Sequence, residues 1–274
     1  MLSIVLPSYN ESKNIQNAYI EIKEVLSEAK IPFELVYVND GSKDDTWTKI
    51  EEIIEKGKAE LKQSRIRGVS FSRNFGKEAA ILAGLANATG EACVVMDCDM
   101  QHPPETLVEM YRLWQEGYEV VEGVKRTRGK ESLVYKSSAK LFYRLMTKAT
   151  GIDMSRASDF KLMDRKVVKS ILSMPERNMF FRGLSSWVGF KKTEVEFDVR
   201  EREFGTSKWS KWSLVKYAVK NIAAFSTVPM QFVTIAGTLT LLGALILGIQ
   251  TLVRYFTGHA VQGFTTVILL LLII

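Results

Sequence analysis

The sequence predicts an α/β fold with a mostly parallel sheet, followed by membrane-spanning helices toward the C-terminal end. Short apolar runs alternate with helix-like segments over residues 1–125, and polar residues follow four of those runs. No charged residue occurs over residues 221–253. Strands that alternate with helices are typical of a parallel sheet with helices on both faces, and ligands bind such sheets beyond the carboxyl ends of the strands.

The predicted elements follow from the spacing of the apolar residues along the chain. Apolar runs predict strands at residues 2–7, 33–38, 66–70, 92–96 and 120–124. Amphipathic patterns predict helices at residues 12–29, 44–58, 77–88 and 104–116. The polar strand ends read PSYNE (7–11), NDGSKDD (39–45), FSRNFG (71–76) and DCDMQ (97–101). All four open on one rim of a parallel sheet, so we expect a ligand site there.

The composition excludes several classes of protein and site. The 274 residues are 46% hydrophobic and 25% charged, enough to bury one substantial core, or a domain with an appendage. Cys93 and Cys98 lack the spacing of a zinc or redox motif, so we interpret both as core residues. The two histidines, His102 and His259, lie far apart, and no Ser/His/Asp or Cys/His nucleophile set is legible.

The apolar segment before Arg254 predicts a membrane span. A bilayer core needs about 20 apolar residues in a helix, so residues 228–253 are predicted to cross it. A second apolar run at residues 264–274 predicts the start of another span, cut short. Lysines crowd the approach to the first span, at Lys208, Lys211, Lys216 and Lys220. The positive-inside rule therefore predicts a multi-pass protein of the inner or plasma membrane with a cytoplasmic N-terminal domain, and no signal peptide is expected.

Asp97 and Asp99 directly follow an apolar run, and two interpretations are open. A loop that leads into a helix at Pro103 or Pro104 explains acceptor side chains there. A divalent cation, Mg²⁺ or Mn²⁺, explains two hard oxygen ligands on one loop. No GxGxxG follows the first strand and no GxxxxGK(S/T) occurs anywhere. The phosphates of a nucleotide then need another counter-charge, which favours the cation.

Basic residues dominate residues 123–150, where Glu131 is the only acid. Basic residues recur every four positions, as on one face of a helix, at Lys136, Lys140, Arg144 and Lys148. A solvated face is the plain alternative, but a nearby membrane favours lipid contact, because each basic side chain near an anionic leaflet contributes about 1 kcal/mol. Residues 206–226 are predicted to form an amphipathic interfacial helix, with an apolar stripe at Trp212, Val215, Val219 and Ile222.

Five motifs in order resemble the polyprenyl-phosphate glycosyltransferases, which include bactoprenol glucosyltransferases and dolichol-phosphate mannose synthases. They read LPSYNE (6–11), NDGSKDDT (39–46), DCDMQHPPE (97–105), SDFKLMDR (158–165) and REFGTSK (202–208). The resemblance covers residues 2 to about 253. It implies a GT-A fold over residues 1–205 and the transfer of one sugar from a nucleotide-sugar to a membrane polyprenyl phosphate, with inversion at the anomeric carbon.

The resemblance also implies residue roles. Pro7, Tyr9, Glu11, Asp40 and Asp97 would bind the nucleotide-sugar donor. The metal ligands would be Asp97, Asp99 and Gln101, and a helix-capping role is the alternative for Gln101. The phosphate-binding residues would be Lys125, Arg126, Lys136 and Arg202. Many relatives carry arginine at the position of Lys125, and lysine keeps the charge but loses the bidentate fork.

Asp159 matches an aspartate often proposed as the catalytic base, alongside catalytic Asp97 and Asp99. The acceptor is a phosphate monoester with a second pKa of about 6, so near pH 7 it is largely ionised and needs little deprotonation. Asp159 is therefore expected to orient the sugar hydroxyls or a basic partner; a structural cap and the base role stay open.

The donor and acceptor follow from the same bacterial relatives. The expected donor is UDP-glucose and the acceptor undecaprenyl phosphate in the bilayer; UDP-GlcNAc and GDP-mannose are alternatives. A processive polysaccharide synthase is a rival, although its usual QxxRW motif is absent. A non-catalytic membrane scaffold leaves the polar strand ends unexplained. Nucleic acid is not an expected partner, because no recognised binding module accompanies the pI of about 9.1. The oligomeric state, homo-oligomer included, stays open.

Overall fold

The computed structural model describes residues 1–61, 64–126, 147, 158–174, 180–200, 227–259 and 267. The chain divides into two compact units, Met1–Asn221 and Ile222–Ile274. The strands of the first unit are β1 (Leu2–Ser8), β2 (Phe33–Asn39), β3 (Arg65–Ser70), β4 (Ala92–Val95), β5 (Val120–Lys125), β6 (Lys161–Asp164) and β7 (Lys192–Phe197). Its helices are α1 (Ile15–Glu28), α2 (Thr46–Glu60), α3 (Lys77–Asn87), α4 (Glu105–Gln115), α6 (Arg165–Leu172) and α7 (Phe181–Trp187), and the second unit contains α9 (Val228–Phe256).

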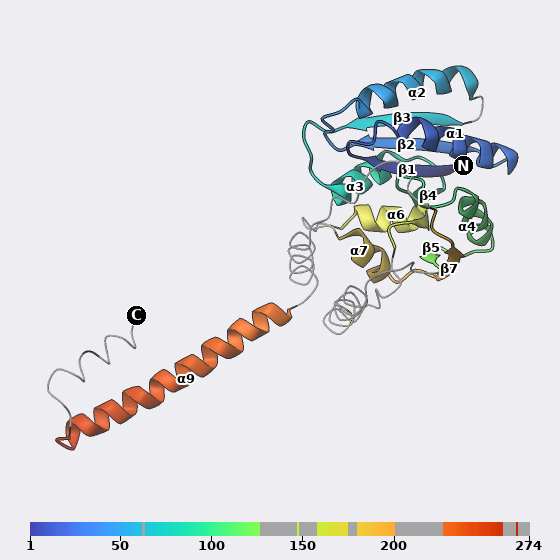
Figure 1. The fold of residues 1–274 in the computed structure, drawn as a ribbon. Helices are drawn as coiled ribbons and strands as arrows, with labels where there is room; N and C mark the ends of the chain where they lie inside the picture. The colour runs from blue at the N-terminus through green and yellow to red at the C-terminus, as the bar shows by residue number, and fades with distance from the viewer. Residues whose placement is uncertain are drawn as a thin grey trace. The chain divides into compact units, whose positions relative to one another are not determined.

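A seven-stranded sheet forms the centre of the first unit, in the order β3-β2-β1-β4-β6-β5-β7. Figure 1 shows β3, β2 and β1 side by side, with β4 next to β1. The first four strands in this order are parallel, as predicted. Strand β6 runs antiparallel to both of its neighbours, β4 and β5, and β7 pairs with β5 in parallel. The prediction of a mostly parallel α/β sheet is confirmed for β1 to β4, and the antiparallel insertion of β6 was not predicted.

Helices cover both faces of the sheet because strand residues alternate between two apolar cores. On one face, residues such as Ile4 and Leu35 pack with α1, α2 and α4. On the other, residues such as Val5 and Val36 pack with α3, α6 and α7. Cys93 and Cys98 are both buried, as expected for core residues. Burial on both faces explains why these strands read as nearly continuous apolar runs.

The strand order reverses at β1, which lies between β2 and β4. Parallel sheets bind ligands at such a switch point, beyond the carboxyl ends of the strands. Val5 pairs with Val95 across β1 and β4, so the segments that follow these two strands emerge side by side. They are in contact: the Ser8 hydroxyl and the Cys98 thiol lie 3.1 Å apart. The fold therefore brings the PSYNE and DCDMQ segments together.

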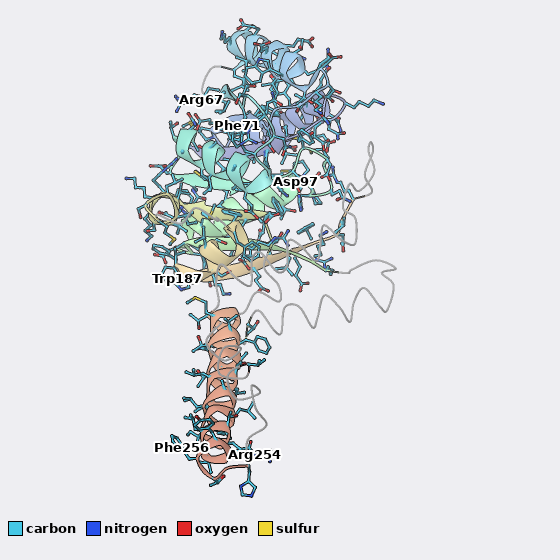
Figure 2. The ribbon with its side chains drawn as sticks, turned by 90° about the vertical axis from the view of Figure 1, so that its left-hand side faces the viewer. Arg67, Phe71, Asp97, Trp187, Arg254 and Phe256 are labelled. Atoms are coloured by element: carbon cyan, nitrogen blue, oxygen red, sulfur yellow. The ribbon has the colours of Figure 1, made fainter. Side chains whose placement is uncertain are left out.

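The second unit contains a helix, α9, with 29 residues. At 1.5 Å per residue it is about 43 Å long, more than the roughly 30 Å of a bilayer core. The helix Met230–Phe256 contains an 18-residue stretch with a mean hydropathy of 2.2, and it is the one helix in the described part of the chain that is long and apolar enough to cross a membrane. Its apolar side chains project outward along the whole length down to Arg254 and Phe256 (Figure 2).

Threonine hydroxyls in α9 are satisfied within the helix. Thr234, Thr238 and Thr240 each donate to the carbonyl oxygen four residues earlier, at 2.8 to 2.9 Å. Such bonds leave no hydroxyl donor in need of water. Of the predicted second span, residues 264–274, only Val267 is among the described residues, so a multi-pass arrangement is not shown. The predicted interfacial helix, residues 206–226, lies outside them.

Candidate active site

The first two strand-end segments are joined by hydrogen bonds. The backbone N–H of Asn10 donates to Ser42 Oγ at 2.9 Å, and the N–H of Lys43 donates to Asn10 Oδ1 at 2.8 Å. The N–H of Glu11 donates to Thr46 Oγ1 at 2.9 Å. Asn10 adopts a left-handed conformation, with a φ of 54°. The segments after β1 and β2 therefore form one polar surface.

Asp40 fixes a third strand-end segment, residues 71–76. Its carboxylate is buried and accepts the backbone N–H groups of Phe75 at 2.7 Å and Gly76 at 2.9 Å. Burial raises the pKa of Asp40, and the two N–H groups act in the opposite direction. The family resemblance implies that Asp40 binds the nucleotide; in the structure both of its oxygens accept backbone N–H groups of the loop that leads into α3. Its role toward a nucleotide stays a prediction.

Gly41 allows the second and third segments to touch. Its φ is +62°, and a Cβ there would lie 2.2 Å from the carbonyl carbon of Arg73, which is backbone and cannot yield. Gly41→Ala is therefore expected to lose stability by more than the roughly 1–2 kcal/mol that a left-handed alanine costs. Gly189→Ala is the matched control, because its φ is +71° and the nearest atom lies 3.9 Å away.

Denaturant unfolding compares these two variants. The Gly41→Ala variant is expected to unfold at a clearly lower denaturant concentration than the Gly189→Ala variant. Equal losses would mean that backbone strain alone explains the effect, and that the contact between Gly41 and Arg73 is unimportant.

The DCDMQ segment forms a tight turn directly after β4. The backbone N–H of Gln101 donates to Asp99 Oδ1 at 3.2 Å, and Met100 between them has a φ of 55°. Asp99 is buried, whereas about a third of the Asp97 side chain is exposed. No side chain among the described residues caps the start of α4, which does not support the capping role for Gln101.

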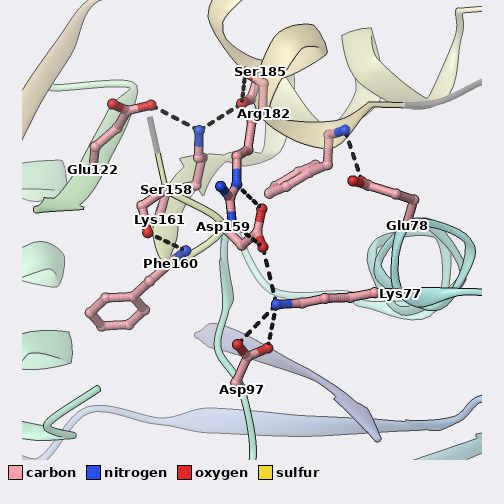
Figure 3. A network of polar contacts seen from close by, with 11 residues as sticks. Lys77, Glu78, Asp97, Glu122, Ser158, Asp159, Phe160, Lys161, Arg182 and Ser185 are labelled. Atoms are coloured by element: carbon pink, nitrogen blue, oxygen red, sulfur yellow. Dashed lines mark hydrogen bonds and ion pairs between the residues drawn. The ribbon is translucent and has the colours of Figure 1, made fainter. Parts of the chain in front are cut away.

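Lys77, the first residue of α3, forms ion pairs with two aspartates that are far apart in the sequence, Asp97 and Asp159 (Figure 3). Its ammonium nitrogen lies 2.7 Å from Asp97 Oδ1 and 2.9 Å from Oδ2. It also lies 3.0 Å from Asp159 Oδ2. Arg182 in α7 binds Asp159 from the other side in a bidentate fork, with Nε and Nη2 at 2.7 and 2.9 Å from the two carboxylate oxygens.

These contacts set the charge state of Asp159. Burial raises its pKa, but Lys77 and Arg182 outweigh burial and hold the pKa well below its usual range. Burial likewise raises the pKa of Asp97, and Lys77 again makes the net direction downward. Both carboxylates are therefore ionised at any physiological pH. A carboxylate with so low a pKa is a weak proton acceptor.

A buried ion pair lies beside this site, on the side of Asp159 away from Asp97 (Figure 3). Lys161 Nζ lies 2.8 Å from Glu122 Oε1 and donates to Ser185 Oγ at 2.7 Å. Ser185 in turn donates to the carbonyl oxygen of Arg182 at 3.2 Å. The Lys161 and Glu122 side chains are almost completely inaccessible to solvent, at 0% and 4% exposure. Burial lowers the pKa of Lys161 and Glu122 opposes this.

Removal of one partner from this pair is expected to be costly. Lys161→Met leaves the Glu122 carboxylate buried without its cation, so unfolding free energy should fall by about 3–5 kcal/mol. The double variant Lys161→Met/Glu122→Leu should recover most of the loss, and Lys192→Met, at an exposed position in β7, is the control. Denaturant unfolding measures all three; a loss in the double variant as large as in the single one would contradict the pairing.

Asp97, Asp99 and Gln101 offer two carboxylates and an amide on one turn. Within the described part of the chain, no group of three or more His, Cys, Asp or Glu side chains forms a closed metal site. Mg²⁺ is usually held by one or two carboxylates together with substrate phosphates. The ammonium of Lys77 on Asp97 shows that a cation is attracted to this position. The donor set therefore fits Mg²⁺ or Mn²⁺ that binds with a diphosphate.

Of the other predicted site residues, those in the described part of the chain lie in or shortly after β1 and β5. Lys125 ends β5 and is exposed, and Arg126 forms ion pairs with Glu196 at 3.7 Å and Asp198 at 3.2 Å. Pro7 lies in β1, and Tyr9 and Glu11 follow it, all partly buried. Lys136 and Arg202 lie outside the described residues.

Two residues of the site were missed from the sequence, Lys77 and Arg182. Lys77 directly follows the polar segment FSRNFG, which is the signal that could have found it. Arg182 belongs to α7, a helix that was not predicted, and no motif surrounds it. Its position opposite Asp159 depends on tertiary structure alone.

The chain has well-matched relatives in bacteria and phages. An uncharacterized glycosyltransferase of Bacillus subtilis, YkcC, is 41% identical, and the match covers 99% of this chain and 83% of that protein. A prophage bactoprenol glucosyl transferase homolog of Escherichia coli is 34% identical over 99% of this chain and 87% of that protein. The bactoprenol glucosyl transferase of Shigella phage SfV is also 34% identical, with the same coverage.

Solved structures share the fold at low identity. Mannosyl-3-phosphoglycerate synthase from Rubrobacter xylanophilus is 17% identical with a TM-score of 0.53, over 82% of this chain and 72% of that chain. The mannosyltransferase PcManGT from Pyrobaculum calidifontis is 16% identical with a TM-score of 0.50, over 97% and 83%. These likenesses identify a GT-A-like fold. The model of glycosyl transferase family 2 matches residues 3–172, and the chain therefore belongs to this family and is a glycosyltransferase.

Proposed function

We propose that the protein transfers one sugar from a nucleotide-sugar to a polyprenyl phosphate, with inversion at the anomeric carbon. The observation that carries the proposal is the meeting of Asp97, after β4, and Asp159, before β6, at the Lys77 ammonium, next to the switch point at β1. The bactoprenol glucosyl transferases related to this chain over nearly their whole length support a lipid phosphate acceptor.

The proposed donor is UDP-glucose, in line with the named activity of these relatives. Pro7, Tyr9, Glu11 and Asp40 lie on the joined strand-end segments, where they would bind base and ribose. UDP-GlcNAc and GDP-mannose remain the alternative donors. Asp97, Asp99 and Gln101 would hold Mg²⁺ or Mn²⁺, which neutralises diphosphate oxygens and stabilises the charge of the leaving group.

The chain's own residues would position the reactants. An oxygen of the acceptor phosphate attacks the anomeric carbon, and the bond from that carbon to the diphosphate oxygen breaks with its electron pair on the leaving nucleoside diphosphate. The attacking oxygen is already ionised near pH 7, so no residue needs to remove a proton. Asp159, fixed by Arg182, would orient the sugar, and the phosphates would be bound by Lys125, Arg126, Lys136 and Arg202.

The membrane supplies the acceptor, and we propose that α9 anchors the enzyme there. Residues 1–205 would form the cytoplasmic catalytic domain, 206–226 would lie at the interface, and 228–253 and 264–274 would span an inner or plasma membrane. The length, apolar composition and internally satisfied threonines of α9 support this arrangement.

Transfer of label into a lipid extract tests the proposed function. Protein in detergent with Mg²⁺ is incubated with labelled UDP-glucose, UDP-GlcNAc or GDP-mannose, with and without undecaprenyl phosphate. We expect organic-phase label only with the lipid phosphate, and most with UDP-glucose. A water-soluble polymer would indicate a processive polysaccharide synthase instead, and no transfer from any of the three donors would contradict the proposal.

A further inference from the structure

The sheet itself forces Asp97 and Asp159 together. Val95 in β4 pairs with Lys161 in the antiparallel strand β6, and the two aspartates lie two residues beyond that pair, one on each chain segment. Two ionised carboxylates at adjacent positions repel each other. The Lys77 ammonium lies within 3.0 Å of both, so it neutralises a repulsion that the fold creates.

The backbone of Lys77 is held in place from two sides. The N–H of Gly76, the residue before it, donates to Asp40. The carboxylate of Glu78, the residue after it, accepts the N–H of Phe181 at 2.9 Å. The side chain has more freedom, because 38% of it is exposed. The ammonium can therefore leave Asp97 without a change in the helix.

The charges in this group already balance. Two carboxylates, Asp97 and Asp159, face two cations, Lys77 and Arg182. A divalent cation on Asp97 would lie close to the Lys77 ammonium and be repelled by it. The nucleoside diphosphate of the donor would offer the ammonium another anion as the metal takes its place.

We propose that Lys77 occupies the metal-facing oxygens of Asp97 until the donor arrives, and then contacts the diphosphate. Lys77 thereby couples metal binding to nucleotide binding and positions Asp159 throughout. The inference rests on the proposed metal set of Asp97, Asp99 and Gln101. Its consequence is that metal binds weakly to the free enzyme and more tightly when a nucleoside diphosphate is bound. The gain in metal affinity is larger than the contact between metal and phosphate alone would give.

Direct binding of Mn²⁺ tests this without any turnover. The full chain in detergent is titrated with Mn²⁺, and free Mn²⁺ is measured by electron paramagnetic resonance, with and without UDP. Lys77→Met should raise Mn²⁺ affinity without UDP by about tenfold or more, equivalent to about 1.4 kcal/mol. The enhancement of Mn²⁺ affinity by UDP should shrink correspondingly, because the coupling between the two ligands is reciprocal.

Two variants serve as controls. Lys77→Arg keeps the charge, and Lys49→Met removes a lysine that pairs with Glu52 on the surface of α2; both should bind Mn²⁺ as the wild type does. Should Lys77→Met not fold, Lys77→Gln replaces it in the same comparison. If Lys77→Met bound Mn²⁺ with the same affinity as the wild type, the inference about Lys77 would be overturned, and the proposed metal set would still stand. Absence of Mn²⁺ binding in every protein, with or without UDP, would overturn the proposed metal set and the inference with it.

Discussion

The Asp99→Asn variant is expected to lose sugar transfer by more than about 100-fold while it stays folded. Mutation of a residue that only hydrogen-bonds to a metal ligand typically lowers metal affinity or activity by about 10–100-fold. Loss of a direct ligand should therefore lower activity by at least about as much. The fold should tolerate the change, because an asparagine oxygen can still accept the backbone N–H of Gln101. Removal of one carboxylate beside Asp97 also relieves repulsion in the metal-free protein.

Transfer rate and melting temperature are measured together for this variant. We expect a melting temperature without metal that equals or exceeds that of the wild type. Glu109→Gln, which removes a carboxylate from an exposed pair with Arg112 in α4, is the control and should transfer sugar normally. Unfolding of the Asp99→Asn variant would indicate a structural role, and full transfer by it would contradict the metal set.

The Asp159→Asn variant is expected to lose about 100-fold in kcat/KM, by the same factor at every pH from about 5.5 to 9. Misplacement of a reactant by about 1 Å can cost this much, and asparagine cannot satisfy both Arg182 and Lys77. The low pKa of Asp159 means that it does not titrate in this range. The acid limb of the wild-type profile should therefore reflect the acceptor phosphate, with its second pKa of about 6.

The pH profile separates positioning from base catalysis. Arg182→Lys is the companion variant, because it keeps the positive charge but loses the bidentate fork on Asp159. We expect a smaller defect in this variant that is also independent of pH. A defect of Asp159→Asn that fades steadily as pH rises would instead restore the general base, since a dianionic acceptor needs no proton removed.

Most of the parallel half of the fold was predictable because β1, β2 and β4 are buried on both faces. Buried strands read as apolar runs, and amphipathic helices fill the intervals between them. The later elements give weaker signals. Strand β6 has four residues and includes the buried Lys161, so it lacks an apolar run. Strand β7, Lys192–Phe197, has six residues, and only two of them, Val195 and Phe197, are apolar.

Only the site residues that lie in the sequence motifs were predictable. Polar strand ends at the switch point placed Asp97 near Pro7 and Tyr9 without knowledge of the structure. The network that governs Asp159 was not predictable, because it depends on the antiparallel register of β6 against β4. Lys77 belongs to α3 and Arg182 to α7, and the two residues are more than a hundred positions apart in the sequence. Local patterns carry no information on such contacts.

The mass of the lipid product tests the central claim most directly. Wild-type protein is incubated with UDP-glucose, Mg²⁺ and a defined polyprenyl phosphate, and the extracted lipid is analysed by mass spectrometry. The proposed function predicts a product with the mass of the polyprenyl phosphate plus one hexose residue. A ladder of several sugars, addition of a sugar phosphate, or an unmodified lipid beside free glucose would contradict it.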